Sequence, residues 1–332
     1  MSGINGSMAH LSDTLFTTAI AAYALAMVGF TAEYSFGKKE LRAGAKVATP
    51  ARELVGAGAP LLDKTPEPPA PPPAVRRSFA EKIGRWSVIL MVFGLLVHAG
   101  SVAVRGIAVD AVPWSNMYEF ASVAGLVGVL AFLIVLWRAP SIRRLGGFIL
   151  LPVIVMMFLA GTVWYSRAAP LVPALQSYWL AIHVTLAAVS EGAFMTSAVL
   201  TFLYLLSARH ARRPLKSARL ATLVSRLPSA DTLDKAAYRV VAFSFPLYTV
   251  AVICGAIWAE AAWGRYWGWD PKETWAFIVW VIYACYLHAR ATAGWKGRAA
   301  AWINLTGFGA ITFNFLVVNI VVSGLHSYAG LS

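Results

Sequence analysis

Long apolar runs recur along this chain of 332 residues, and they limit the folds that it can adopt. The runs at residues 86–104 and 301–322 are close to the roughly 20 residues that an α-helix needs to cross a bilayer. Charged residues make up only 13% of the sequence, whereas soluble domains contain about 25%. We therefore predict an all-α fold, a polytopic bundle of transmembrane helices.

The loops between the apolar runs divide into a basic set and a nearly neutral set. Eight spans are predicted, at residues 14–36, 86–104, 118–137, 147–165, 179–207, 241–260, 275–292 and 301–323. The loops that contain 24 of the 28 Lys and Arg residues are 37–85, 138–147, 208–240 and 290–298. The positive-inside rule places these loops in the cytoplasm and both termini outside. The net charge of +13 thus reflects topology, and we expect a multi-pass protein of a bacterial plasma membrane with no nucleic acid partner.

The first basic loop contains a proline-rich stretch, PEPPAPPPA, at residues 66–74. Proline lacks a backbone N–H and favours an extended conformation. Residues 37–85 are therefore predicted to form a mostly disordered cytoplasmic linker, which follows an N-terminal span in residues 1–36. A docking site for a partner that recognises proline is the alternative interpretation of this stretch.

Tryptophan is concentrated in one loop, which the predicted topology places outside. Six of the 13 tryptophans lie between Trp258 and Trp280, and the centre of this segment is WGRYWGWDPKETW, residues 263–275. An aromatic belt at the membrane interface explains about two or three of them. Gly264 and Gly268 allow a tight turn or the close approach of a flat ligand to the backbone. We call residues 263–275 the tryptophan loop.

The end of the tryptophan loop has the signature of a helix start. Asp270 is a candidate N-cap, Pro271 follows at the first helical position, and Glu273 completes a capping box. Arg265 and Lys272 could bind carboxylates on a ligand. A porphyrin with propionates suits both the aromatic faces and these cations. From the spacing alone, heme, another planar ligand and a purely interfacial role all stay open.

Two histidines lie at the predicted depth of the tryptophan loop. His183 lies one turn inside the outer end of the span at 179–207, and His326 lies just past the outer end of the last span. Neutral imidazoles at matching depth could ligate one iron from opposite faces. The alternative is a pair of interfacial histidines that are hydrogen-bonded to backbone or water.

A third histidine, His288, lies near the cytoplasmic end of the span at 275–292. The helix from Trp275 to His288 rises by roughly 20 Å, so His288 would belong to a second, inner site. His98 lies at a different depth, and we interpret it as a hydrogen-bonded packing residue. A partner protein is therefore expected to supply the second ligand beside His288.

The sequence resembles the CcsA (ResC) family of cytochrome c biogenesis proteins, within the wider group of WWD-domain heme-handling proteins. The resemblance covers residues 86–332, which we expect to form the assembly domain. The motifs that carry it are WGRYWGWDPKETW at 263–275, LQSYWLAIHV at 175–184, LHAR at 287–290, GLHSY at 324–328 and the shorter PWSNMYEF at 113–120.

The resemblance implies a subunit of a holocytochrome c synthase (heme lyase) that exports heme b and attaches it covalently to apocytochrome c outside. It implies a partner of the CcsB (ResB) type, His183 and His326 as external iron ligands, and His288 as a transmembrane ligand. The implied heme-contacting residues are Trp263, Gly264, Arg265, Trp267, Gly268, Trp269, Asp270, Lys272, Glu273 and Trp275. Glu191, in the middle of a span, departs from the family pattern; packing is its default interpretation, and a proton or propionate contact is the alternative.

Attachment adds the two thiols of a Cys-x-x-Cys-His peptide across the heme vinyl groups. This chain contains no such motif, which is expected of the synthase and not of its substrate. No catalytic acid or base can be assigned, so we predict catalysis by positioning. The nearest alternative is a WWD-type chaperone or transporter that delivers heme without forming the thioether bond. A b-type electron-transfer subunit and a solute transporter are further alternatives.

Overall fold

The computed structural model describes residues 4–47, 79–171, 175–292, 294–322 and 324–325, without the side chains of 37–47. These residues form helices and no strands. The long helices are α1 (Gly6–Val47), α2 (Phe79–Val109), α3 (Met117–Arg138), α4 (Gly146–Thr162), α5 (Tyr178–Arg212), α7 (Ala230–Trp263), α8 (Pro271–Ala291) and α9 (Arg298–Phe313). The short ones are the 3-10 helix η1 (Pro140–Leu145), α6 (Ala218–Val224), the π-helix η3 (Asn314–Val318) and α10 (Asn319–Val321).

The all-α, polytopic fold class is confirmed. Seven helical segments among the described residues are long and apolar enough to cross a membrane, and they match seven of the eight predicted spans. The eighth predicted span is α8, whose aromatic residues, histidine and charged ends lower its hydropathy. Which end of the bundle faces outward stays a prediction.

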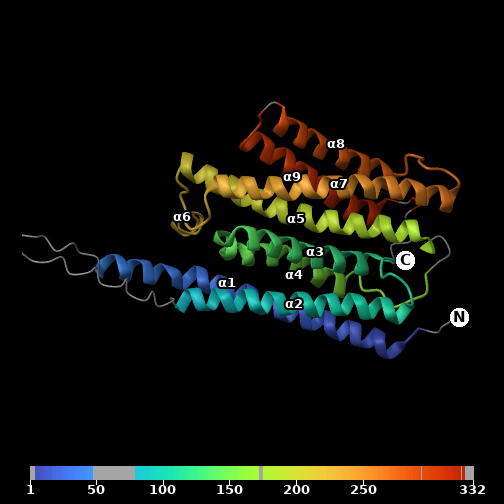
Figure 1. Cartoon of the computed structure of the whole chain (residues 1–332), viewed down its shortest axis with the longest axis horizontal. Helices are drawn as coiled ribbons and strands as arrows, with labels where there is room; N and C mark the ends of the chain where they lie inside the picture. Colours follow the sequence, from blue (N-terminus) through green and yellow to red (C-terminus); the bar gives the residue numbers. More distant parts are fainter. Residues whose placement is uncertain (1–3, 48–78, 172–174, 293, 323, 326–332) are drawn as a thin grey trace, which may run out of the picture.

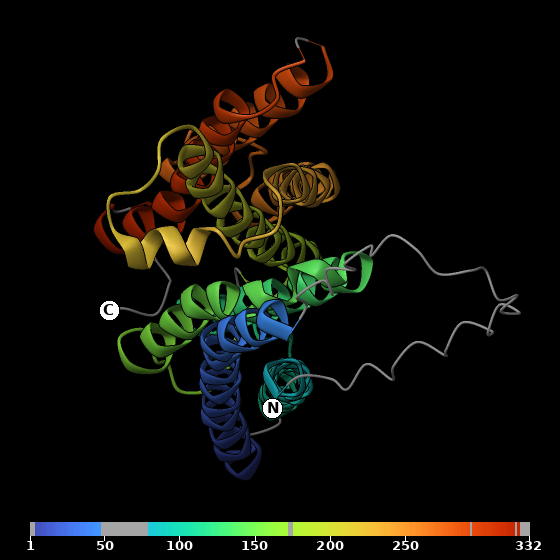
Figure 2. The ribbon, with the colours of Figure 1, turned by 90° about the vertical axis from the view of Figure 1, so that its left-hand side faces the viewer.

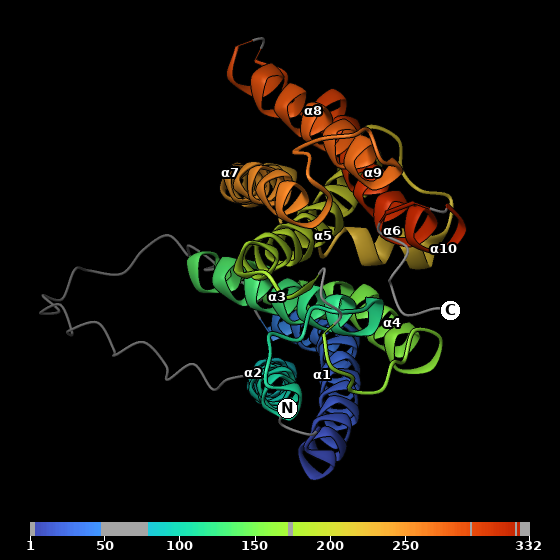
Figure 3. The ribbon, with the colours of Figure 1, turned by 90° about the vertical axis from the view of Figure 1, so that its right-hand side faces the viewer.

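The helices form successive layers from one edge of the bundle to the other. Figure 2 and Figure 3 show α1 and α2 at one edge, α8 and α9 at the opposite edge, and the remaining long helices between them. Helix α1 packs on α2 and α4, α3 packs on α4 and α5, and α5 packs on α7 and α9. The start of α1, α10 and the tryptophan loop lie at one end, which we call the loop end (Figure 1).

Helices α1 and α2 extend into the range that we predicted as a linker. Helix α1 ends at Val47 and α2 begins at Phe79, so the predicted limits of 37 and 85 are too wide. Lys, Glu, Leu, Arg and Ala are frequent in these extensions and have high helix propensity, which allows the helices to continue past their apolar parts. The predicted disorder at 48–78 lies outside the described residues.

Polar side chains and small residues hold the middle of the bundle together. Asn304 on α9 donates from Nδ2 to the hydroxyls of Ser197, at 2.9 Å, and Thr201, at 2.7 Å, on α5. A Cβ atom on Gly192 of α5 would lie 2.4 Å from a backbone oxygen of α3, so glycine permits this close approach. Helices α3, α5 and α9 are thus fixed around the space described next.

Candidate functional site

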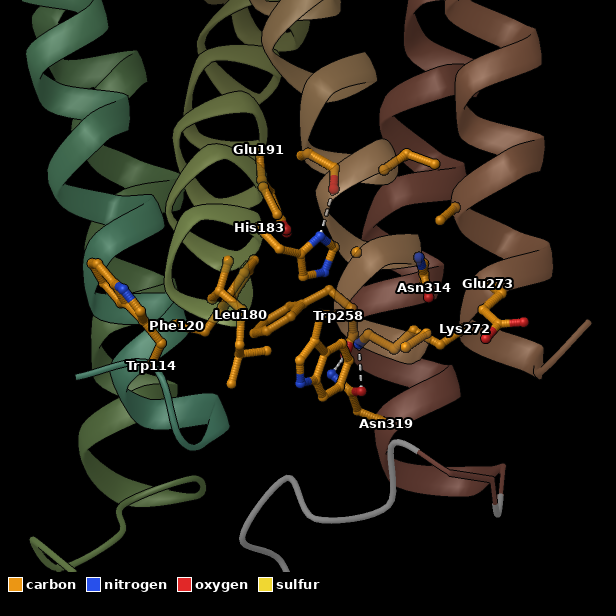
Figure 4. Close-up of a pocket in the computed structure, with 18 of the residues that line it drawn as sticks. Trp114, Phe120, Leu180, His183, Glu191, Trp258, Lys272, Glu273, Asn314 and Asn319 are labelled. Atoms are coloured by element: carbon orange, nitrogen blue, oxygen red, sulfur yellow. Dashed lines mark hydrogen bonds between the residues drawn. The ribbon is translucent and has the colours of Figure 1, made fainter. Parts of the chain in front are cut away.

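A cavity lies at the loop end of the bundle, between α3, α5, α7, α8 and η3 (Figure 4). Most of its lining is apolar or aromatic. Its polar lining residues include His183 and Glu191 from α5, Lys272 from α8, and Asn314 and Asn319 from the last helical segment. A mostly apolar cavity with a few placed polar groups is the usual form of a ligand site.

His183 projects into this cavity with a defined tautomer. Its Nδ1 donates a hydrogen bond to the carbonyl oxygen of Ala251 on α7 at 2.7 Å. Because a carbonyl oxygen can only accept, Nδ1 carries the proton and Nε2 keeps a lone pair. Metal-ligating histidines in proteins are oriented by the same kind of bond from the other ring nitrogen. The ring of Trp258 lies nearly parallel to the imidazole, with 6.3 Å between centroids and 14° between planes.

A glycine on α7 makes room for this imidazole. A Cβ atom on Gly255 would lie 2.6 Å from Nδ1 of His183, which is closer than real Cβ contacts. The imidazole is held by the Ala251 carbonyl and cannot move aside without losing that bond. Gly255 is therefore a positioning residue for His183.

Replacement of Gly255 by valine is expected to displace the imidazole of His183, the predicted iron ligand, while keeping that residue in the chain. Loss of a supporting interaction around a metal ligand typically costs about 10- to 100-fold in affinity. Heme titration of the purified variant should show a loss of this size at the site that contains His183. Gly309, where an added Cβ meets open space, provides the matched control as Gly309→Val. Equal heme affinity of both variants would contradict the role of Gly255.

The tryptophan loop is held between two helix ends. Gly264, with φ of 69°, is the left-handed C-cap of α7, a conformation that favours glycine. Asp270 is the N-cap of α8, and the predicted capping box with Glu273 is confirmed. Oε2 of Glu273 also accepts the backbone N–H of Gly268 at 2.8 Å. Glu273 therefore fixes the fold of the loop as well as the start of α8.

The two basic residues of the loop have different surroundings. Nη1 of Arg265 pairs with Oε1 of Glu273 at 3.3 Å, and the guanidinium occupies the place that a side chain on Gly268 would need. The charge of Arg265 is thus balanced within the loop. Lys272 lines the cavity, and its ammonium contacts Oδ1 of Asn319. Of the two cations that we predicted to bind ligand carboxylates, only Lys272 lines the cavity.

The tryptophans of the loop do not form one platform. Trp267 lines the cavity, whereas Trp263 packs on Trp258 and Trp275 packs on Phe313. Trp269 is 65% exposed and has a positive φ of 59°, which is rare for a bulky residue and marks local strain. The structure thus brings Trp267, Lys272 and Glu273 to the cavity that contains His183. The other predicted loop residues do not line this cavity: Trp263, Gly264, Arg265, Gly268, Trp269, Asp270 and Trp275.

His326 lies outside the described residues, but the chain just before it is anchored to the tryptophan loop. The backbone N–H of Leu325 donates to Oδ1 of Asp270 at 2.9 Å. A Cβ atom on Gly324 would lie 2.7 Å from the same oxygen, so glycine permits this approach. Asp270, which we predicted from its place in the loop, therefore also holds the segment that leads to residue 326.

The other two histidines of interest are far from this cavity. His288 lies near the opposite end of α8 with an exposed side chain, and its ring has no hydrogen bond to a described residue. His98 is fully buried, with Nε2 at 2.9 Å from the Ser122 hydroxyl and Nδ1 at 3.4 Å from the Tyr23 hydroxyl. The interpretation of His98 as a hydrogen-bonded packing residue is confirmed.

A buried ion pair supports the wall of the cavity that α3 contributes. Nε of Arg105 on α2, 2% exposed, donates to Oε1 of Glu119 at 3.0 Å. Oε2 of Glu119 accepts both the backbone N–H and the hydroxyl of Ser115 at 2.8 Å. Residues 114–117 line the cavity, so Arg105 fixes this wall from outside it. Arg105 also lies 3.7 Å from Asp13 of α1.

Several cavity residues were not predicted as site residues. Trp258 lies on α7 before the loop, and Asn314 and Asn319 lie in the last span. Polar residues inside a membrane span are a functional signal by default, so the two asparagines could have been found. Trp258 had no such signal, because a tryptophan near a span end is usually interfacial.

The fold and the site define a polytopic membrane protein with a histidine in an aromatic cavity beside a tryptophan-rich loop. Residues 114–326 match the family described as cytochrome C assembly protein. This match covers more than half of the chain, and the chain belongs to this family. Helices α1 and α2 lie outside the matched residues.

Relatives described as cytochrome c biogenesis protein CcsA are similar over most of the chain. The protein of Guillardia theta is 37% identical over 265 residues, covering 75% of this chain and 86% of the relative. That of Gloeobacter violaceus is 34% identical over 287 residues, covering 72% and 84%. That of Synechococcus elongatus is 35% identical over 279 residues, covering 72% and 85%. The predicted resemblance to the CcsA family is confirmed, and it supports a role in cytochrome c biogenesis.

Proposed function

We propose that this chain exports heme b and attaches it to apocytochrome c, as one subunit of a holocytochrome c synthase. The observation that carries the proposal is His183, whose Nδ1 is bonded to a backbone carbonyl and whose Nε2 is left for iron inside an aromatic cavity. Heme iron is commonly held by a histidine of this kind. Membership of the cytochrome c assembly family supports the substrate.

His326 is proposed as the second external ligand of the same iron. Residues 324–325 contact Asp270, which lies two residues before the cavity-lining Lys272. His183 approaches the cavity from α5, and Leu325 is hydrogen-bonded to Asp270 of the tryptophan loop. Ligands from these two sides would enclose the iron, and Trp258 and Trp267 would contact the macrocycle.

His288 is proposed as the ligand of a separate heme on its way across the membrane. Its side chain is exposed on α8, at the edge of the bundle. An exposed histidine in a helix that crosses the membrane is a functional signal by default. A membrane protein of the CcsB (ResB) type is proposed to supply the second ligand. We further propose that the loop end faces outward from a bacterial plasma membrane.

The attachment step is a thiol addition without net oxidation or reduction. For each cysteine of the apocytochrome, the S–H bond and the π bond of one vinyl group break, and a C–S bond and a C–H bond form. The residues of this chain hold the heme and exclude water from its face, so that the peptide thiols meet the vinyl groups in a fixed geometry. His183 and His326 ligate the iron until the histidine of the peptide replaces one of them.

Replacement of His288 by alanine is expected to remove the inner heme and leave the external one. The absorption spectrum of the complex purified with its partner should lose about half of its heme per chain, because one of two histidine-ligated sites is lost. His210, in the last turn of α5 and bonded to the Leu215 N–H, provides the matched control as His210→Ala. Preparations without heme under any condition would contradict the proposed function. Bound heme without holocytochrome formation would favour the chaperone alternative.

A further inference from the structure

The cavity has an apolar side and a polar side, as Figure 4 shows. Trp114, Phe120 and Leu180 line one side, near the start of α3 and the first turn of α5, whereas His183 and Glu191 lie farther along α5. Lys272, Asn314 and Asn319 line the opposite side, formed by α8 and the last helical segment. Protoheme has a matching asymmetry, because its two propionates project from one edge and its two vinyl groups from the other half of the ring. The cavity therefore distinguishes two ways of inserting the ring.

Lys272 is a cation in this cavity, and the carboxylates that act on it electrostatically are Glu191 and Asp270. Within the part of the chain that the structure describes, its ammonium is hydrogen-bonded to the Asn319 amide and takes part in no ion pair. An ammonium removed from water without a counterion is unfavourable, so the site favours an anion. Arg265 differs, because Glu273 already balances its charge.

Two asparagines complete the polar side. Asn319 donates from Nδ2 to the carbonyl oxygen of Phe315 at 2.7 Å, which fixes its Oδ1 toward Lys272. Asn314 is 8% exposed, and its Oδ1 has no hydrogen-bond partner. Rotation of this amide presents Nδ2, a donor, to a ligand. The π-helix η3 begins at Asn314, and π-helical turns are frequent at functional sites.

Glu191 lines the same cavity from α5, two helical turns past His183 on the same face. An ionised carboxylate at this position repels a second carboxylate. A protonated carboxyl instead donates a hydrogen bond, so the effect of Glu191 on an anion depends on its protonation state. The cation beside Asn319 is therefore the group that carries the preference for an anion.

We propose that Lys272 and Asn314 bind the heme propionates, with Asn319 as the positioning residue for Lys272. The inference rests on the proposed function and adds the orientation of its substrate. With the propionates on the side of α8, the vinyl edge faces residues 114–117. That segment connects α2 to α3 at the loop end, so the apocytochrome thiols would meet the vinyl groups there.

The test compares ferric protoheme with its dimethyl ester, which lacks the carboxylates. Both porphyrins are titrated into the purified full chain that carries His288→Ala, so that only one heme site is observed. Each further variant is made in this His288→Ala chain and compared with it. We expect the unmodified site to prefer protoheme by about tenfold. Lys272→Met should remove this preference and leave ester binding unchanged, and Lys272→Arg should retain it.

Two further variants separate the subsite from a general loss of charge or of folding. Asn314→Leu should weaken protoheme binding by about threefold to tenfold and ester binding little. Lys235→Met, which removes a cation from an exposed pair with Asp231, should change neither. Unchanged ester binding shows that a variant is folded.

The outcomes distinguish this proposal from the proposed function. Equal affinity of the unmodified site for both porphyrins, or a preference that survives Lys272→Met, would overturn the propionate subsite and leave heme binding intact. A Lys272→Met variant that loses both porphyrins equally would also overturn it. Failure of the unmodified site to bind either porphyrin would overturn the proposed function itself.

Discussion

Replacement of His183 by alanine is expected to abolish holocytochrome c formation, with a loss of about a hundredfold or more. The variant removes the iron ligand, and it also leaves the Ala251 carbonyl without its bond from Nδ1. Loss of a residue that only supports a metal ligand lowers metal affinity or activity by about 10- to 100-fold. Loss of the ligand itself should therefore have a larger effect. The amount of holocytochrome c formed in the presence of the partner is measured by heme staining. The absorption spectrum of the purified complex reports its bound heme.

Added imidazole provides the control for this experiment. In His183→Ala the space of the lost ring stays lined by Trp258 and Gly255, so imidazole can enter and ligate the iron. Partial recovery of holocytochrome formation is expected in His183→Ala and not in Gly255→Val, where the added side chain fills that space. Full activity of His183→Ala without imidazole would refute the assignment of His183 as a ligand.

Replacement of Arg105 by methionine is expected to lower the free energy of unfolding by about 3–5 kcal/mol. The change leaves Glu119, 4% exposed, as a buried carboxylate without its cation. Because Glu119 holds Ser115, the wall at residues 114–117 should loosen, and heme affinity should fall with stability. Chemical or thermal unfolding of the detergent-purified chain measures the first effect, and heme titration the second.

A double variant and a surface variant control for this prediction. Arg105→Met with Glu119→Gln removes both charges and keeps an acceptor for Ser115, so most of the lost stability should return. Arg85→Met breaks an exposed pair with Glu81 on the same helix and should change stability by about 0.5 kcal/mol or less. A single variant at Arg105 that is as stable as the unmodified chain would show that the pair does not brace the wall.

The parts of the fold that follow from local sequence were predictable. Apolar length and loop charge located the helices, because a segment in lipid must satisfy its own backbone groups. The capping box at Asp270 and Glu273 was predictable for a similar reason, since its partners are three residues apart. His183 was also found from sequence, because a histidine near the end of a span is rare enough to be informative.

The arrangement of the cavity was not predictable, because it depends on contacts between distant segments. The sequence does not indicate that Arg265 is neutralised by Glu273 while Lys272, only one residue before Glu273, enters the cavity. The π-helix that presents Asn314 to the cavity has no periodic signal, since it inserts a single wide turn into an apolar helix. Trp275 packs on Phe313 of α9, a contact between two helices that local sequence does not indicate.

The bond from His183 to Ala251 has a consequence for how the ligand tolerates mutation. Its acceptor is a main-chain carbonyl, which every amino acid carries, so no side-chain exchange at position 251 deletes the bond itself. The tautomer and orientation of this proposed iron ligand are thus set by the backbone of α7 and not by a neighbouring side chain. Changes that shift this stretch of backbone or crowd the ring would alter the ligand, and Gly255 is where such a change needs the fewest atoms.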